Sequence, residues 1–340
     1  MKNKKWLALA AAVVLAVTAL PATAFAEKKD STDDKILTKI TLNEVAHSIF
    51  YAPQYVAIEK GYFKDEGLDL TLITGFGADK TMTAVISGEA DIGFMGAEAS
   101  IYAYQEGATD PVVNFAQLTQ RAGNFLVARE EMPDFKWEDL KGRKVLGGRK
   151  GGMPEMVFEY ILKQNSLDPQ KDLTIDQSID FGATAAAFTG DDSADFTVEF
   201  EPSATALEKQ GAGHVVASLG VDSGYVPYTS YSAKTSYMEK HPDVIQAFTD
   251  ALQKGMEYVN THTPEEIASV IQPQFSETDT DTITTIIRRY QEQDTWKTDL
   301  VFSEDSFELL LNILESAGQL EKRPDYKDVV TTEYAEKALQ

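Results

Sequence analysis

Cysteine is absent from this chain of 340 residues. A chain without thiols has no disulfide, no thiolate zinc site, no iron–sulfur cluster and no cysteine nucleophile, and it lacks the cysteine that a lipoprotein needs for acylation. Basic residues are also scarce, with 31 Lys and Arg against 54 Asp and Glu, a formal net charge of −23. Nucleic acids and anionic membranes attract basic surfaces, so the composition argues against both as partners.

Long hydrophobic runs are confined to the first residues. MKNKK precedes an apolar run from Trp6 to Leu20 and the tripeptide Ala24-Phe25-Ala26, which is the layout of a secretory signal peptide. We therefore expect residues 1–26 to be a signal peptide and the protein to be secreted, in the periplasm or at the extracytoplasmic face of the membrane. Residues 27–35 are charged and lack an apolar period, which predicts a flexible leader.

Strand-like and helix-like segments alternate after the leader. The pattern predicts strands at 36–45, 68–74 and 91–95, and helices at 53–63, 78–87 and 98–107. This order is typical of an α/β fold with a mostly parallel sheet covered by helices. A similar pattern restarts after Arg121, so we expect two α/β lobes.

The last third of the sequence is almost wholly helical. Thr263-Pro264-Glu265-Glu266 is a capping box with proline in the first turn. Apolar residues then recur at the i, i+3, i+4, i+7 spacing of core-facing stripes. We interpret these stripes as packing against the first lobe.

Candidate ligand contacts stand where strands lead into helices, because ligands of open parallel sheets bind at the carboxyl ends of the strands. Four junctions carry unusual residues for such a turn: His47-Ser48-Ile49-Phe50-Tyr51, Gly96-Ala97-Glu98, Gly151-Gly152-Met153 and Phe200-Glu201. The segment GGRKGGMP can bring backbone N–H groups close to a bound molecule, because Gly151 and Gly152 have no side chains in the way. It matches neither a Walker loop nor a dinucleotide turn, and an ordinary tight turn is the simpler alternative.

Three longer stretches resemble a known family: HSIFYAPQYVAIEKGYFKDEGLDL, GADKTMTAVISGEADIGFMGAEA and WEDLKGRKVLGGRKGGMPEMVFEYILKQNSLDPQKDLTI. They are similar to the nitrate/sulfonate/taurine solute-binding proteins of ABC importers, and most of all to their thiamine-pyrimidine (NMT1/Thi5-like) branch. The resemblance runs from about residue 38 to residue 260. It is specific for fold and transport role and weak for the identity of the ligand.

The resemblance implies a type II periplasmic-binding-protein fold, in which two α/β lobes joined by a hinge close on a ligand in the cleft between them. Mapped onto this chain, lobe one is 36–122 plus 232–340 and lobe two is 123–231. The implied function is the extracytoplasmic solute-binding component of an ABC importer. Its partners are a small-molecule solute, a permease and that permease's ATPase, and we expect a monomer without a cofactor or metal.

The candidate ligand-binding residues leave two solute classes open. Glu98 and Glu201 beside aromatic rings suit a flat, nitrogen-rich ring such as a thiamine pyrimidine precursor. The alternative is that both acids stand at helix N-termini only because the helix macrodipole favours a negative charge there. Arg121 and Arg149 instead suit a sulfonate, taurine or nitrate anion. The full set of predicted contacts is His47, Phe50, Tyr51, Gly96, Glu98, Arg121, Gly151, Gly152, Met153, Glu201 and Tyr228.

An enzyme is the third alternative, since the same branch contains a pyrimidine synthase. That synthase family is expected to need a cysteine-rich iron motif, which this chain lacks. The four histidines have no metal-ligand spacing, and no GxSxG elbow is present. His47 stands at a candidate cleft loop, but a lone histidine is more often a packing or hydrogen-bonding residue. We therefore predict a binding protein and not an enzyme.

Overall fold

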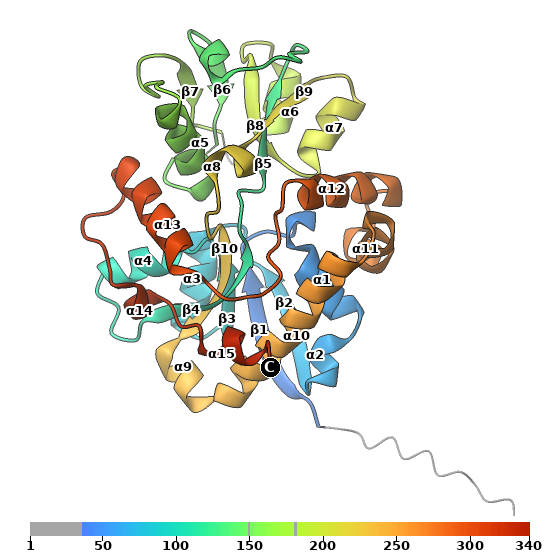
Figure 1. Cartoon of the computed structure of the whole chain (residues 1–340), viewed down its shortest axis with the longest axis vertical. Helices are drawn as coiled ribbons and strands as arrows, with labels where there is room; N and C mark the ends of the chain where they lie inside the picture. The colour runs from blue at the N-terminus through green and yellow to red at the C-terminus, as the bar shows by residue number, and fades with distance from the viewer. Residues whose placement is uncertain (1–35, 149, 180–181) are drawn as a thin grey trace, which may run out of the picture. The chain divides into compact units, whose positions relative to one another are not determined.

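Strands and helices alternate through the first two thirds of the chain, as the sequence pattern predicts (Figure 1). The structure, a computed structural model, describes residues 36–148, 150–179 and 182–340. The predicted signal peptide and leader and the candidate residue Arg149 lie outside these described residues. Residues 36–340 belong to one unit with two separate sheets.

The first sheet has the strand order β2-β1-β3-β10-β4. Its strands are β1 (Thr38–Glu44), β2 (Leu68–Thr74), β3 (Ile92–Met95), β4 (Val112–Thr119) and β10 (Thr229–Lys234). Strand β1 pairs in parallel with β2 and β3, whereas β10 runs antiparallel to β3 and β4. Every residue of β3 and β4 is buried. Strand β3 is correspondingly apolar, whereas β4 also buries the polar residues Asn114, Gln117 and Thr119.

The second sheet repeats this plan with the order β7-β6-β8-β5-β9. Its strands are β5 (Asn124–Ala128), β6 (Lys144–Leu146), β7 (Thr174–Asp176), β8 (Phe196–Phe200) and β9 (His214–Ser218). Here β6 pairs in parallel with β7 and β8, and β5 runs antiparallel to β8 and β9. The α/β fold class is confirmed, with one antiparallel strand inserted into each otherwise parallel sheet.

The chain passes between the sheets twice, from β4 to β5 and from β9 back to β10 (Figure 1). The two inserted strands, β5 and β10, are the ones that directly follow these crossings. The division into lobes at 36–122 plus 232–340 and 123–231 stays a prediction, and its second boundary falls inside β10.

Helices follow most strands at the predicted places. Those of the first two thirds are α1 (Ala52–Glu59), α2 (Tyr62–Asp65), α3 (Ala78–Ser87), α4 (Glu98–Gln105), α5 (Met153–Gln164), α6 (Thr184–Gly190), α7 (Ser203–Lys209) and α8 (Leu219–Ser223). A short 3-10 turn over Ile49–Tyr51 precedes α1. In the described part of the chain, no helix is both long enough and apolar enough to cross a membrane.

The C-terminal third is helical, as predicted, and its helices are α9 (Thr235–Lys240), α10 (Pro242–Thr261), α11 (Pro264–Ile271), α12 (Thr280–Glu292), α13 (Glu304–Ser316), α14 (Tyr326–Val329) and α15 (Glu333–Lys337). The capping box is confirmed: the Thr263 hydroxyl accepts from the Glu266 N–H, and the Glu266 carboxylate accepts from the Thr263 N–H. The expected packing is only partly right. α11 packs on α1, but α13 packs on α5, beside the second sheet.

Candidate functional site

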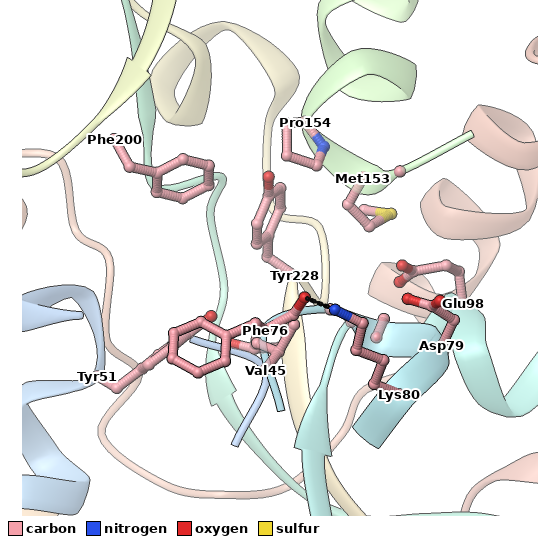
Figure 2. A pocket seen from close by; sticks show the side chains of 15 residues that line it. Val45, Tyr51, Phe76, Asp79, Lys80, Glu98, Met153, Pro154, Phe200 and Tyr228 are labelled. Carbon is pink, nitrogen blue, oxygen red and sulfur yellow. Dashed lines mark hydrogen bonds between the residues drawn. The ribbon is translucent and has the colours of Figure 1, made fainter. Parts of the chain in front are cut away.

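A cavity of about 360 Å³ lies where strand ends of both sheets meet (Figure 2). Its volume is at the lower end of the roughly 300–1,000 Å³ that small-molecule sites occupy, enough for one substituted ring. The described residues that line it are Val45, Tyr51, Phe76, Gly77, Ala78, Asp79, Lys80, Gly96, Glu98, Gly152, Met153, Pro154, Phe200, Tyr228 and Thr229.

The lining follows from the topology of the two sheets. Val45 directly follows β1, and Gly96 directly follows β3, so both stand at the carboxyl ends of neighbouring parallel strands. Phe200 ends β8, and the segment Gly152–Pro154 opens α5 after β6. Ligands of open α/β sheets bind at these strand ends, which explains why distant segments converge here.

Glu98 is the most unusual residue of the wall. It is the first residue of α4, it is 4% exposed, and its Oε2 is buried without a hydrogen-bond partner. Burial raises the pKa of the Glu98 carboxyl to about 7, and a hydrogen bond from its own backbone N–H only partly offsets this. A buried carboxylate oxygen without a partner is costly, so the site is suited to a ligand that donates a hydrogen bond there.

Gly96 makes room for the Glu98 carboxyl group. A Cβ atom at Gly96 would stand 2.1 Å from Glu98 Oε2 and 2.5 Å from Oε1, far inside contact distance. The carboxyl group therefore occupies the space that any side chain at position 96 would need. This packing explains the glycine at position 96.

Aromatic rings form another part of the wall. Tyr51, Phe200 and Tyr228 line the cavity, and Figure 2 shows the Tyr228 ring below Pro154, between Phe200 and Met153 in this view. The Tyr228 hydroxyl is buried without a partner, and burial raises its pKa well above the usual range. The wall thus combines flat apolar surfaces with two unsatisfied polar atoms, Glu98 Oε2 and Tyr228 Oη.

The junction after β2 supplies five lining residues, Phe76 to Lys80, none of which is among the predicted contacts. It brings a second acid, Asp79, into the wall beside Lys80, whose ammonium lies 3.5 Å from the Phe76 carbonyl (Figure 2). Phe76 has a φ of +56°, which is unusual for a bulky side chain. The sequence contains a pattern that could have predicted these contacts. GFGADK leads from a predicted strand into a predicted helix and contains two glycines, like the junctions that supplied the predicted contacts.

The GGRKGGMP segment reaches the cavity, but one of its backbone N–H groups already donates a hydrogen bond within the protein. Gly152 and Met153 line the cavity, whereas Gly151 donates its N–H to the Glu155 carboxylate at 3.0 Å. The Glu155 pKa is raised to about 7, chiefly by burial. Gln177 donates to the same carboxylate at 2.7 Å. Helix α5 therefore anchors its own preceding turn through Glu155.

Seven of the eleven predicted contact residues lie at the cavity or next to it. Six line it directly: Tyr51, Gly96, Glu98, Gly152, Met153 and Tyr228. Gly151 lines an adjoining cavity. The remaining four, His47, Phe50, Arg121 and Glu201, are outside the lining and have other partners, so we remove them from the proposed contact set.

His47 is held by hydrogen bonds away from the cavity. Its Nδ1 lies 2.8 Å from Glu44 Oε1, and its Nε2 lies 2.8 Å from the Gln274 carbonyl. The hydrogen bond to the fully buried Glu44 is the main reason that the His47 pKa is raised. This arrangement is the packing and hydrogen-bonding role that a lone histidine most often has.

Phe50 and Arg121 support their surroundings. Phe50 is fully buried and packs its ring against those of Tyr51, Phe200 and Tyr228, so it stands behind the three lining rings. Arg121 donates from Nη1 to the Gly220 carbonyl at 3.0 Å and lies over the Tyr225 ring. Neither side chain lines the cavity.

Glu201 is fully engaged by protein groups. Its Oε1 lies 2.5 Å from Arg289 Nη1 and accepts from the Thr205 hydroxyl, and its Oε2 accepts from the Thr205 N–H. Arg289 also pairs with Glu208 at 2.7 Å. Because α12 carries Arg289 and β8 precedes Glu201, this ion pair ties the C-terminal helices to the second sheet.

The cavity wall offers hydrogen-bonding groups and aromatic surface. Its polar side-chain groups are two carboxyl groups, one ammonium and the hydroxyls of Tyr51, Tyr228 and Thr229. Among the described residues, no three His, Asp or Glu side chains are grouped as metal ligands. The arrangement can accept hydrogen bonds from a ligand at Glu98 and can stack a flat ring against aromatic side chains.

Comparison with known proteins finds a match to one family model, described as NMT1/THI5 like, over residues 49–267. A protein of Bacillus subtilis (strain 168), "Putative binding protein YtlA", is 45% identical over 333 residues, which are 98% of this chain and 98% of that protein. The 4-amino-5-hydroxymethyl-2-methylpyrimidine phosphate synthase THI11 of Saccharomyces cerevisiae is 24% identical over 62% of this chain and 63% of its own.

Among solved structures, the ligand-binding component of an ABC-type import system from Staphylococcus aureus is similar with a TM-score of 0.70 and 16% identity. The likeness covers 88% of this chain and 99% of that chain. It confirms the predicted periplasmic-binding-protein fold. The similarity over the whole length is to a binding protein, and it confirms the prediction that the chain is a binding protein and not an enzyme.

Proposed function

The chain belongs to the NMT1/THI5-like family, and we propose that it is the solute-binding component of an ABC importer that captures an aminopyrimidine or a similar nitrogen-rich aromatic solute outside the cytoplasm. One observation carries the choice of solute: the buried, unpartnered Oε2 of Glu98 in a wall of aromatic rings. The contacts that we assign to the solute are Tyr51, Gly96, Glu98, Gly152, Met153 and Tyr228, together with Phe200 and Asp79.

An aminopyrimidine matches the two features of this wall. Its exocyclic amino group donates hydrogen bonds, and a bond to an ionised carboxylate is shorter and about twice as strong as one between neutral groups. Its flat ring stacks on aromatic side chains such as Tyr228 or Phe200. Binding would therefore satisfy Glu98 Oε2 and cover apolar ring surface in one step.

The alternative solute, a sulfonate, taurine or nitrate anion, fits the lining less well. Glu98 and Asp79 would stand beside the anion, and a carboxylate next to a like charge is costly unless it is protonated. Arg121, proposed from the sequence as an anion clamp, is engaged at Gly220 outside the lining. Lys80 is the basic group among the described lining residues.

The transport role requires that solute binding change the shape of the protein. The lining residues come from both sheets, so a bound solute contacts the two predicted lobes, 36–122 plus 232–340 and 123–231, at once. A solute that binds better between closed lobes shifts the protein towards the closed form. We propose that a permease with its ATPase recognises this closed form of a secreted monomer.

The test is calorimetric titration of the purified, solute-stripped protein with 4-amino-5-hydroxymethyl-2-methylpyrimidine, taurine, an alkanesulfonate and nitrate. We expect binding of the pyrimidine and a loss of about 10- to 100-fold in Glu98→Gln, since a hydrogen bond to a charged group contributes about 1.5–3 kcal/mol. Glu89→Gln is the matched control, because Glu89 is an exposed acid outside the cavity lining. Binding of the anions alone would refute the proposed solute.

A further inference from the structure

A second cavity adjoins the first and is larger, with a volume of about 510 Å³ against about 360 Å³. The two cavities share four lining residues, Ala78, Asp79, Glu98 and Gly152. Glu98 and its unpartnered Oε2 therefore stand where the two spaces meet. A single pyrimidine ring does not need this additional space.

The wall of the second cavity is mainly apolar. Helices α3 and α4 supply Met82, Ile86, Ala99 and Ala103, and the half-buried Tyr102 adds its ring. The Tyr102 hydroxyl points to a protein partner, because it lies 3.6 Å from the Met156 sulfur. An apolar group entering this space would be removed from water, which is the main source of affinity for such groups.

The charges around the second cavity have one sign. Three lining residues are acids, Asp79, Glu98 and Glu106, and no described lining residue is basic. A phosphate or carboxylate entering the space would meet these carboxylates and lose its hydration without a partner. An uncharged group avoids both costs, and a positively charged group loses hydration but is attracted by these carboxylates.

We propose that the solute carries, besides its aminopyrimidine ring, an apolar substituent without negative charge that occupies the second cavity. This inference rests on the proposed function, because it places the ring in the first cavity against Glu98. The solute class is then an extended aminopyrimidine, neutral or cationic in its second part. Phosphorylated pyrimidines are excluded from the class.

The test uses a series of 4-amino-2-methylpyrimidines that differ only at C5, with hydroxymethyl, butyl, 4-aminobutyl and 3-carboxypropyl substituents. We expect the butyl and aminobutyl compounds to bind at least tenfold more tightly than the hydroxymethyl compound, since each buried methylene contributes about a fourfold gain. The carboxypropyl compound is expected to bind more weakly than the butyl compound by tenfold or more.

Variants that fill the second cavity test whether the gain in affinity of the butyl compound arises there. Ala103→Leu adds volume on α4, and Ile86→Trp does so on α3 at a position that is 49% exposed and tolerant of a large side chain. Both variants are expected to abolish the gain of the butyl compound and to leave binding of the hydroxymethyl compound within twofold. Thr83→Trp is the matched control on α3, because Thr83 is exposed and lines neither cavity.

The outcomes separate the two proposals. Equal binding of all C5 compounds, tighter binding of the carboxypropyl compound, or a gain that persists in both filled variants overturns the second cavity as a subsite. In these cases binding of the hydroxymethyl compound, and with it the proposed function, stands. Failure of every compound to bind overturns both proposals.

Discussion

Glu98 and Glu201 occupy similar places in the sequence and opposite places in the protein. Each stands at a junction between a buried strand and a helix, Glu98 as the first residue of α4 and Glu201 two residues before α7, and each side chain is almost completely buried. Glu201 is paired with Arg289 and accepts two hydrogen bonds from Thr205. Glu98 has an oxygen without a protein partner in the wall of a cavity.

The difference shows that burial alone does not distinguish a binding acid from a structural one. A buried charge needs compensation, and the source of that compensation decides the role of the residue. For Glu201 it comes from the protein, through an arginine 88 positions away in the sequence. For Glu98 we propose that it comes from the solute.

The largest expected effect is on the structural acid. Arg289→Met removes the partner of the fully buried Glu201 carboxylate and should lower the free energy of unfolding by about 3–5 kcal/mol. Arg288→Met is the matched control one residue away, because the Arg288 pair with Glu265 is exposed on both sides and should contribute at most about 1 kcal/mol. Urea denaturation of both variants measures the difference. Equal losses would mean that Glu201 has another source of compensation.

Glu201→Gln changes the acid of the same ion pair instead of its arginine partner. The neutral glutamine amide cannot pair with Arg289 as a carboxylate does, so we expect a loss of about 2 kcal/mol in the free energy of unfolding. Affinity for 4-amino-5-hydroxymethyl-2-methylpyrimidine should stay within about twofold, because Glu201 is outside the cavity lining. A tenfold loss of affinity with unchanged stability would reverse the roles assigned to the two acids.

The pH dependence of stability should report on Glu98. Its pKa of about 7 in the folded protein is above that of an unfolded glutamate, so the folded protein holds this proton more tightly. The stabilisation is complete below about pH 4.5 and is lost as the pH rises through about 7, a change of roughly 2 kcal/mol or more. Glu155 and Glu199 have raised pKa values and act in the same direction.

The difference between wild type and Glu98→Gln isolates the share of Glu98. Without solute, the variant should lose less stability than wild type between pH 5 and pH 8 in urea denaturation. Parallel curves for the two proteins would show that the Glu98 carboxyl is ionised throughout this range.

The smallest expected effect comes from Gly96→Ala. The new Cβ would stand where the Glu98 carboxyl group lies, so the carboxyl must turn away from its present position. We expect affinity for the hydroxymethyl pyrimidine to fall by about three- to tenfold, with a loss of stability below about 1 kcal/mol. Calorimetric titration beside thermal unfolding measures both. Unchanged affinity would mean that the Glu98 carboxyl group does not bind the solute from its present position beside Gly96.

Local sequence patterns predict much of the fold. Strand β2 and helix α3 have the predicted bounds, and the Thr263 capping box is present with both of its hydrogen bonds. Strand β10 is missed by the sequence analysis because TSYSAK is polar and short, although all but its last residue are buried. Its burial is due to its place between β3 and β4, which no local pattern encodes.

The sequence by itself determined where the candidate site would form, because strand ends followed by glycine and helix-starting residues are visible in the order of amino acids. Tyr51, Gly96, Glu98, Gly152 and Met153 all follow from that order. Only the tertiary structure decided which polar groups remain without a partner. The Gln274 carbonyl reaches His47, and Arg289 reaches Glu201, through packing of distant segments, and these contacts engage both side chains outside the cavity lining.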